Sequence, residues 1–207
     1  MRYLLILLTF ICVPITVQAR PVSYPDGWTL MLMNDKDMNS SHIHYSPTAK
    51  YSVGWRHDYL RDSKAHMDTI QLNNLLKRWN KPSEQANLYL KTGIGVVRED
   101  GSYAPAAFTG IAADWETRRY FTSYENHLLW ASDTEKHIKH KARVGIAPYI
   151  GDYGDLHTWT MLQLDYDAGA DDSFSVTPLV RFFKDSTMIE AGYNFDNGIQ
   201  LNFVQRF

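Results

Sequence analysis

The last ten residues of the chain, residues 198–207, alternate between apolar and polar side chains up to a final phenylalanine. Neighbouring residues of a β-strand point to opposite sides of the sheet, so such a segment forms a strand with two unlike faces. The apolar face holds Ile199, Leu201, Phe203 and Phe207, and the polar face holds Gln200, Asn202 and Arg206. A strand of this kind needs an apolar medium on one side and a polar interior on the other.

The same two-residue period recurs along most of the chain, between short turn signals. The alternating segments are residues 28–34, 40–46, 51–59, 66–79, 87–96, 107–116, 119–130, 139–150, 156–166, 174–183, 188–195 and 199–207. They predict an all-β fold of about 12 antiparallel strands, or 10 if the first hairpin is irregular. The segment 66–79 has a second interpretation, since its apolar residues also fit a helix. As a strand it would change face at a bulge near Asn73 and Asn74.

An amphipathic final strand that ends on Phe207 resembles the closing strand of the bacterial outer-membrane β-barrel superfamily. The resemblance implies a closed, monomeric, up-and-down transmembrane barrel in the outer membrane, in contact with outer-membrane lipid and lipopolysaccharide. It also implies that the barrel-assembly machinery reads Phe207 as an assembly signal. Gln205 departs from the pattern, because an apolar or aromatic residue is usual there. A soluble periplasmic barrel would alternate in the same way but would turn its apolar faces inward.

The beginning of the chain favours export and therefore the membrane alternative. Residues 1–19 combine a short positive start, an apolar stretch and a small residue at the end, which predicts a signal peptide followed by the barrel at residues 20–207. Cys12, the only cysteine, lies in this leader, so the mature chain has no thiol for a disulfide or a metal. The formal net charge of −2 and the lack of a basic stripe argue against a nucleic-acid partner.

If the apolar faces meet lipid, the polar faces line a lumen that contains charges of both signs. We expect these charges to pair or to stay hydrated, because an unpaired buried charge costs several kcal/mol. The predicted lumen network consists of Arg56, Asp58, Lys91, Asp114, Glu116, Arg119, Glu125, Lys141, Arg143, Glu190 and Arg206. The network favours a rigid, cross-linked interior, with a narrow path lined by Arg119, Lys141 and Arg143 as the alternative. So few strands exclude a wide pore.

The first predicted hairpin carries a possible metal site. Met31 and Met33 share one strand face, His42 and His44 share a face of the next strand, and Met38 lies in the turn between them. Thioether and imidazole together suit Cu(I), and imidazole also accepts Cu(II) or Zn(II). The alternative is that the methionines pack in the sheet and the histidines are solvated.

The same hairpin offers an enzymatic alternative. His44-Tyr45-Ser46 is similar to the His-x-Ser pair of two outer-membrane lipid hydrolases, the phospholipase A and the lipid A deacylase. That similarity implies His44 as base and Ser46 as nucleophile for acyl transfer, although Pro47 departs from the polar residue usual there. A second idea concerns the predicted outer edge around Lys139 and Lys141, with His137 and His140, which could meet lipopolysaccharide phosphates. Together the patterns favour a non-enzymatic envelope role: structural, binding, or narrow passage of a solute or metal.

Overall fold

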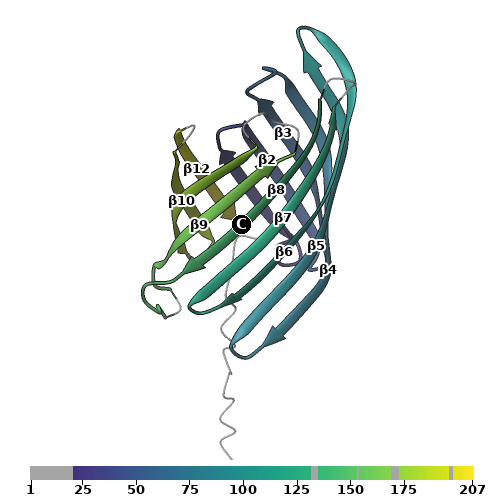
Figure 1. The fold of residues 1–207 in the computed structure, drawn as a ribbon. Helices are drawn as coiled ribbons and strands as arrows, with labels where there is room; N and C mark the ends of the chain where they lie inside the picture. The colour runs from purple at the N-terminus through teal and green to yellow at the C-terminus, as the bar shows by residue number, and fades with distance from the viewer. Residues whose placement is uncertain (1–20, 132–134, 153, 169–172, 196–197) are drawn as a thin grey trace, which may run out of the picture.

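The chain folds into a closed β-barrel of twelve strands (Figure 1). The computed structural model describes residues 21–131, 135–152, 154–168, 173–195 and 198–207, so the predicted leader and its Cys12 lie outside the described residues. The strands are β1 (Gly27–Asn34), β2 (Met38–Thr48), β3 (Tyr51–Leu60), β4 (His66–Lys81), β5 (Glu84–Glu99), β6 (Ser102–Thr117), β7 (Tyr120–Ala131), β8 (Glu135–Ile146), β9 (His157–Asp167), β10 (Phe174–Lys184), β11 (Thr187–Asn194) and β12 (Gly198–Arg206). The predicted count of twelve is confirmed.

Each strand pairs antiparallel with its sequence neighbours, and the ring closes between β1 and β12. At the closure Thr29 lies opposite Arg206 and Asn34 lies opposite Leu201. The Trp28 N–H donates to the Phe207 carbonyl (2.7 Å), and the Phe207 N–H donates back to the Trp28 carbonyl (3.1 Å). The barrel therefore has no open sheet edge, as a spanning sheet requires.

The barrel has two unlike ends. The end where β1 begins and β12 finishes, here called the terminal end, also carries the turns at 49–50, 82–83, 118–119, 147–156 and 185–186. The opposite end, here called the mouth end, carries the turns at 35–37, 61–65 and 100–101 and lies at the top of Figure 1. Of the described connections, the segment 147–156 between β8 and β9 is the longest.

The ambiguous segment 66–79 is a strand and not a helix. β4 is continuous, with a register shift between Leu75 and Lys77, slightly beyond the predicted position at Asn73 and Asn74. A bulge exchanges the two faces of a strand. Arg78 consequently turns to the lumen side, where its Nε donates to Asn87 Oδ1 (2.7 Å).

The predicted boundary of the eighth strand is displaced. The sequence indicates a strand over 139–150, whereas β8 ends at Ile146 and the chain leaves the sheet at Ala147. Pro148 has no N–H to donate to a neighbouring strand, which accounts for the early end.

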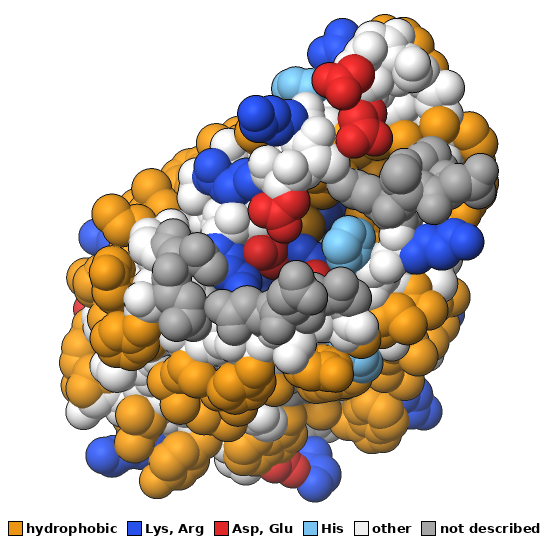
Figure 2. Space-filling model, turned by 45° about the horizontal axis from the view of Figure 1, so that its top comes forward, with side chains coloured by type: hydrophobic (Ala, Val, Ile, Leu, Met, Phe, Trp, Pro, Cys, Tyr) orange, Lys and Arg blue, Asp and Glu red, His pale blue; other side chains and the backbone are white. Residues whose placement is uncertain are grey.

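The outer wall is apolar (Figure 2). Exposed aliphatic side chains lie along the middle parts of the strands: Ile70, Ile94, Ile111, Val144, Leu162 and Leu201. Exposed aromatic side chains lie near both ends: Trp28, Tyr51, Trp79, Tyr120 and Phe182 at the terminal end, and Tyr103, Trp130, Tyr166, Phe174 and Tyr193 at the mouth end. An apolar belt between two aromatic girdles is the surface of a barrel that spans a membrane. No helix of the described residues is long and apolar enough to cross a membrane.

The inner wall combines two apolar clusters with a polar region between them. The mouth-end cluster consists of Leu60, Ala65, Met67, Val97, Ala106, Phe108, Leu129 and Ala131. The terminal-end cluster consists of Phe121, Ala147, Trp159, Met161 and Leu179. The two clusters lie toward opposite ends of the barrel, and buried polar side chains such as Asp58, Gln163 and Glu190 lie between them.

Candidate functional site: the lumen and its mouth

The lumen contains a cavity of about 260 Å³. Figure 2 looks toward the mouth end and shows charged side chains gathered in the hollow, while apolar side chains cover the outer wall. The lining carries equal numbers of basic and acidic residues: Lys36, Arg56, Lys91, Lys139, Lys141, Arg143 and Arg181 against Asp35, Asp37, Asp114, Glu125, Asp165, Asp167 and Glu190. The charges that line the cavity thus balance formally, beside apolar side chains such as Phe121 and Met188.

Glu190 on β11 is the centre of one ion-pair network. Its side chain is fully buried. The Nε of Arg181 donates to it at 2.7 Å, Asn202 Nδ2 donates at 2.8 Å, and Arg143 Nη1 lies 3.3 Å away. The Arg181 guanidinium also lies over the Phe121 ring, 4.7 Å from its centroid. Two guanidinium groups therefore share one carboxylate in a water-poor part of the wall.

Asp58 on β3 is the centre of a second network. It is fully buried and accepts hydrogen bonds from Arg56 Nε (2.7 Å) and from the Ser40 hydroxyl. The Ser40 oxygen in turn lies 2.6 Å from His42 Nε2. Because the hydroxyl proton of Ser40 points to Asp58, His42 donates its Nε2–H to Ser40.

The remaining predicted lumen residues also lie on the inner face, with one exception. Lys91 Nζ donates to Glu125 (2.6 Å), Asp114 accepts from Asn87 Nδ2 (2.7 Å), and both Glu116 and Arg206 are buried. The prediction for Arg119 is wrong. Arg119 is exposed in the turn between β6 and β7, because the Thr117 hydroxyl accepts the backbone N–H groups of Arg119 and Tyr120 and ends the strand there.

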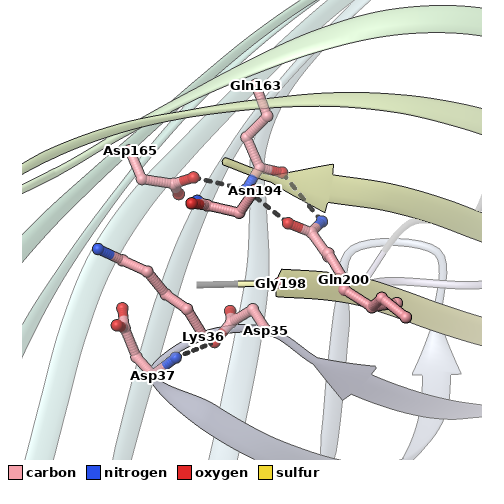
Figure 3. A pocket seen from close by; sticks show the side chains of 9 residues that line it. Asp35, Lys36, Asp37, Gln163, Asp165, Asn194, Gly198 and Gln200 are labelled. Atoms are coloured by element: carbon pink, nitrogen blue, oxygen red, sulfur yellow. Dashed lines mark hydrogen bonds between the residues drawn. The ribbon is translucent and has the colours of Figure 1, made fainter. Parts of the chain in front are cut away.

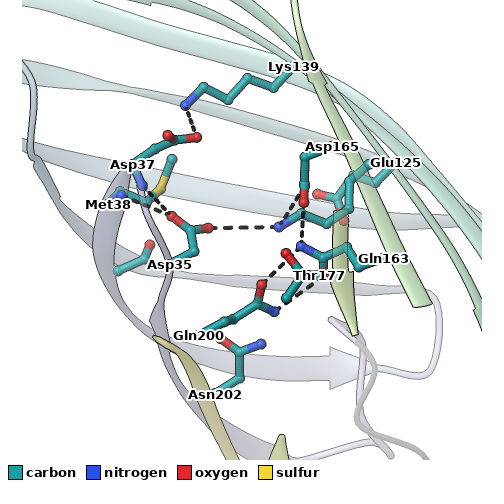
Figure 4. A network of polar contacts seen from close by, with 12 residues as sticks. Asp35, Asp37, Met38, Glu125, Lys139, Gln163, Asp165, Thr177, Gln200 and Asn202 are labelled. Atoms are coloured by element: carbon teal, nitrogen blue, oxygen red, sulfur yellow. Dashed lines mark hydrogen bonds and ion pairs between the residues drawn. The ribbon is translucent and has the colours of Figure 1, made fainter. Parts of the chain in front are cut away.

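A bridge of ion pairs crosses the mouth. The turn between β1 and β2 reaches over to β8, which lies on the opposite side of the ring. Lys139 Nζ is 2.8 Å from Asp37 and 3.5 Å from Asp167. Lys141 Nζ is 3.8 Å from both Asp35 and Asp165. Figure 4 shows Asp35 and Asp37 facing Lys139 and Asp165 from across the lumen. We call residues 35–37 the mouth turn.

The mouth turn is held in a fixed shape. Asp35 Oδ1 accepts the backbone N–H groups of Asp37 (3.0 Å) and Met38 (2.9 Å). On its other side the turn encloses a minor pocket of about 20 Å³ with Gln163, Asp165 and Gln200 (Figure 3). The turn therefore divides the mouth between this minor pocket and the main cavity.

The sequence did not identify the mouth turn as functional. The Asp35-Lys-Asp37 triplet was interpreted only as a polar turn, and Lys139 and Lys141 were assigned to an exposed edge with His137 and His140. An exposed edge is wrong for both lysines, which point inward, so Lys141 lies where the predicted lumen network places it. His137 also faces inward, 3.5 Å from Asp167, and only His140 faces outward, where it contacts Tyr124 and Tyr166. The alternation of β8 contained the signal, since odd-numbered residues there face the lumen.

All five predicted metal-site residues line the cavity. Met31 lies directly opposite His42 across β1 and β2, and His42 and His44 have ring centroids 5.6 Å apart. Met38 belongs to β2 and not to the turn, and its sulfur accepts from Arg56 Nη2 (3.7 Å). Within the described part of the chain, no three His, Cys, Asp or Glu side chains form a group that could hold a metal ion.

The structure separates the two members of the His-x-Ser pair. Both side chains are fully buried on the lumen face, away from the lipid-facing wall. The Ser46 hydroxyl accepts from the Ser23 N–H (3.0 Å), whereas His44 Nδ1 lies 3.3 Å from Asn73 Nδ2. A nucleophile needs its base within hydrogen-bond reach. The pair therefore lacks the arrangement that acyl transfer on a membrane lipid requires.

A polar cluster on the outer wall was also missed. His57 Nδ1 lies 2.9 Å from Asp68, the Trp55 indole N–H donates to Asp68 at 3.2 Å, and His66 stacks beside His57. These residues lie near the mouth end of β3 and β4, beyond the aliphatic belt. The mutual hydrogen bonds explain how polar side chains are tolerated on this wall.

Comparisons with known proteins give distant structural likenesses. No family model and no curated protein matches the chain. Among solved structures, it is similar to OccK11 (OpdR) of Pseudomonas aeruginosa (6% identity, 86% of this chain, 62% of that chain, TM-score 0.43) and to OccAB4 of Acinetobacter baumannii (11%, 86%, 57%, 0.43). It is also similar to a loop-deletion mutant of OmpT, an outer membrane protein of Vibrio cholerae (10%, 87%, 96%, 0.29). The chain spans about 60% of the length of the first two.

The barrel's own surfaces identify its class. An even-numbered, closed, antiparallel barrel with a lipid-compatible exterior and a charged interior has the architecture of a transmembrane β-barrel of the outer-membrane type. The alternative of a soluble barrel required apolar faces turned inward, which the exposed Ile70 and Ile94 contradict.

Proposed function

We propose that the protein is a non-enzymatic outer-membrane barrel that takes a small solute or ion into its lumen from the mouth end. The observation that carries this proposal is the bridge from the mouth turn to Lys139 and Lys141, above a cavity lined by charges of both signs. A lumen that only stabilises the barrel would not need a cavity. A wide pore would not need ion pairs across its mouth. In this proposal the chain works as a monomer surrounded by outer-membrane lipid, and closure of the ring leaves no strand edge through which two copies could pair.

The size and charge of the cavity limit what it accepts. A volume of about 260 Å³ lies below the roughly 300–1,000 Å³ of pockets for drug-sized ligands. The balanced lining charges give no strong preference for cations or anions. An ion or a small polar molecule is the occupant that fits.

The terminal end is occupied by the chain itself. Val22 and Ser23 are buried, and Pro21 lines the cavity. The Ser52 hydroxyl donates to the Pro21 carbonyl (2.7 Å), and the Ser23 N–H donates to Ser46. This segment therefore narrows the lumen beside β2 and β3 at the terminal end, whereas the mouth end lies at the other side of the barrel.

The mouth turn provides the test. We expect the Asp35→Asn/Asp37→Asn variant to show larger K⁺/Cl⁻ currents in planar lipid bilayers than the unmodified protein, and a shift toward anion selectivity. The physical reason is that Lys139 and Lys141 lose the carboxylates that hold them across the mouth. Long-range attraction of anions by the freed lysines also predicts that the shift weakens with salt.

The matched control is Asp152→Asn, which removes an exposed carboxylate from a turn at the terminal end. Its currents should equal those of the unmodified protein. Unchanged currents and selectivity in the Asp35→Asn/Asp37→Asn variant would contradict the proposal. Release of fatty acid from phospholipid or lipid A by the purified barrel, lost on Ser46→Ala, would replace it with the hydrolase alternative.

A further inference from the structure

The lumen face of the first hairpin presents two thioethers to two imidazoles. β1 directs Met31 and Met33 inward, and β2 directs His42 and His44 inward. Met31 is the cross-strand partner of His42, and directly opposite residues have Cβ atoms about 4.5–5.5 Å apart. Both pairs line the main cavity, so the four side chains form one continuous patch, which we call the Met/His patch.

His42 is oriented for coordination by the residues behind it. Ser40 donates to Asp58 and accepts the His42 Nε2–H, which leaves the lone pair on His42 Nδ1. A metal-binding histidine almost always gives its other ring N–H to a carboxylate or a similar acceptor, which fixes the tautomer. The Asp58–Ser40–His42 chain supplies that arrangement.

His44 supplies an independent indication of a ligand site. The side chain is fully buried, yet its Nε2 has no hydrogen-bond partner among the described residues, and the residue lines the cavity. A buried polar atom left without a partner costs about 1–3 kcal/mol. A ligand bound at the patch would remove that penalty.

The chemistry of the available donors selects the class of ligand. The carboxylates nearest the patch are already engaged, Asp58 by Arg56 and Glu190 by Arg181 and Arg143. Hard divalent cations therefore find no free oxygen donors, while thioether sulfur and imidazole nitrogen remain. All six methionines of the described residues face the lumen: Met31, Met33, Met38, Met67, Met161 and Met188. Soft thioethers favour Cu(I).

We propose that the Met/His patch binds a soft monovalent metal ion of the Cu(I) class, held by the directly opposed pair Met31 and His42, with Met33 and His44 as the neighbouring donors on either side of that pair. Val204 on β12 is the cross-strand partner of both Met31 on β1 and Met188 on β11. Met188 therefore lies at the same level of the barrel as Met31 and lines the cavity as a further sulfur donor. Met38 is not a ligand, because Arg56 occupies its sulfur. The assignment rests on the proposed function, since it names the ion that the lumen takes up.

The test is a Cu(I) titration of the full, folded barrel in detergent, under reducing conditions with a competing chromophoric chelator. The unmodified protein should take up Cu(I), and Zn(II) should not compete. The Met31→Leu/Met33→Leu variant should lose most of this affinity. Ser40→Ala should lower the affinity for Cu(I) by about 10–100-fold, which is the usual effect of removing a residue that orients a metal-binding histidine.

The matched control is Met67→Leu/Met161→Leu, which replaces two lumen methionines that pack in the apolar clusters and do not line the cavity. It should bind Cu(I) like the unmodified protein. Heat-modifiable gel migration of every variant shows that the barrel is folded. Absence of Cu(I) binding by the folded, unmodified protein, equal binding of Zn(II), or unchanged affinity in Met31→Leu/Met33→Leu would overturn the assignment. The copper-free K⁺/Cl⁻ currents test the proposed function separately.

Discussion

At the scale of single residues, the interior depends on carboxylates that hold more than one cation. Glu190 is fully buried between Arg143 and Arg181, with Asn202 completing its hydrogen bonds. Taking one member out of a buried ion pair leaves the other charge without a partner in a medium that solvates it poorly. Such residues are therefore more important for folding than surface ion pairs of the same geometry.

We accordingly predict that Glu190→Ala lowers the free energy of unfolding by about 3–5 kcal/mol, because two guanidinium groups remain buried and facing each other. The measurement is urea unfolding of the barrel in lipid vesicles, followed by tryptophan fluorescence and gel migration. Asp152→Ala is the comparison, since its carboxylate is 93% exposed and pairs with Arg118 at 3.4 Å. That variant should unfold like the parent, and equal losses in both would disprove the role of Glu190.

At the scale of strands, the two-residue period could predict the number of strands and which faces meet lipid. It could not predict events that depend on neighbouring strands. The Thr117 hydroxyl holds a turn that keeps Arg119 out of β7, which begins at Tyr120, and the bulge in β4 lies beyond Asn74. The contact between the mouth turn and β8 could not be predicted for the same reason, because Asp37 and Lys139 are 102 residues apart in sequence. No local pattern reports which opposite wall a turn will reach.

Strand packing also makes a prediction at Gly54, the cross-strand neighbour of His44. A Cβ atom at this position would lie 1.9 Å from the Ile43 carbonyl oxygen, which belongs to the backbone and cannot move aside. We expect Gly54→Ala to destabilise the barrel by about 1–3 kcal/mol, the usual cost of overpacking. Gly145→Ala is the control, since its Cβ would crowd only the flexible Met161 side chain and would lie 3.5 Å from the Thr160 carbonyl oxygen, an ordinary contact. Refolding yield in detergent should fall for the first variant and stay near the parent value for the second.

At the scale of the whole molecule, the final strand both closes the ring and bears the predicted assembly signal. Phe207 exchanges backbone hydrogen bonds with Trp28, while its ring is exposed on the outer wall. Gln205, the residue that departs from the superfamily pattern, also faces outward. Its amide is satisfied by the Thr187 hydroxyl (2.5 Å) and the Ser186 hydroxyl (2.9 Å), so a polar side chain is tolerated there.

Closure and signalling are separable, because closure uses the backbone of Phe207 and signalling would use its ring. We therefore predict that Phe207→Ala reduces the folded protein recovered in the outer-membrane fraction of cells but leaves refolding of the purified chain in detergent nearly unchanged. Phe195→Ala, which removes a 70% exposed aromatic ring at the mouth end, should affect neither. An equal loss of refolding in vitro would mean that the ring of Phe207 stabilises the barrel itself, and normal recovery from cells would mean that it is no assembly signal.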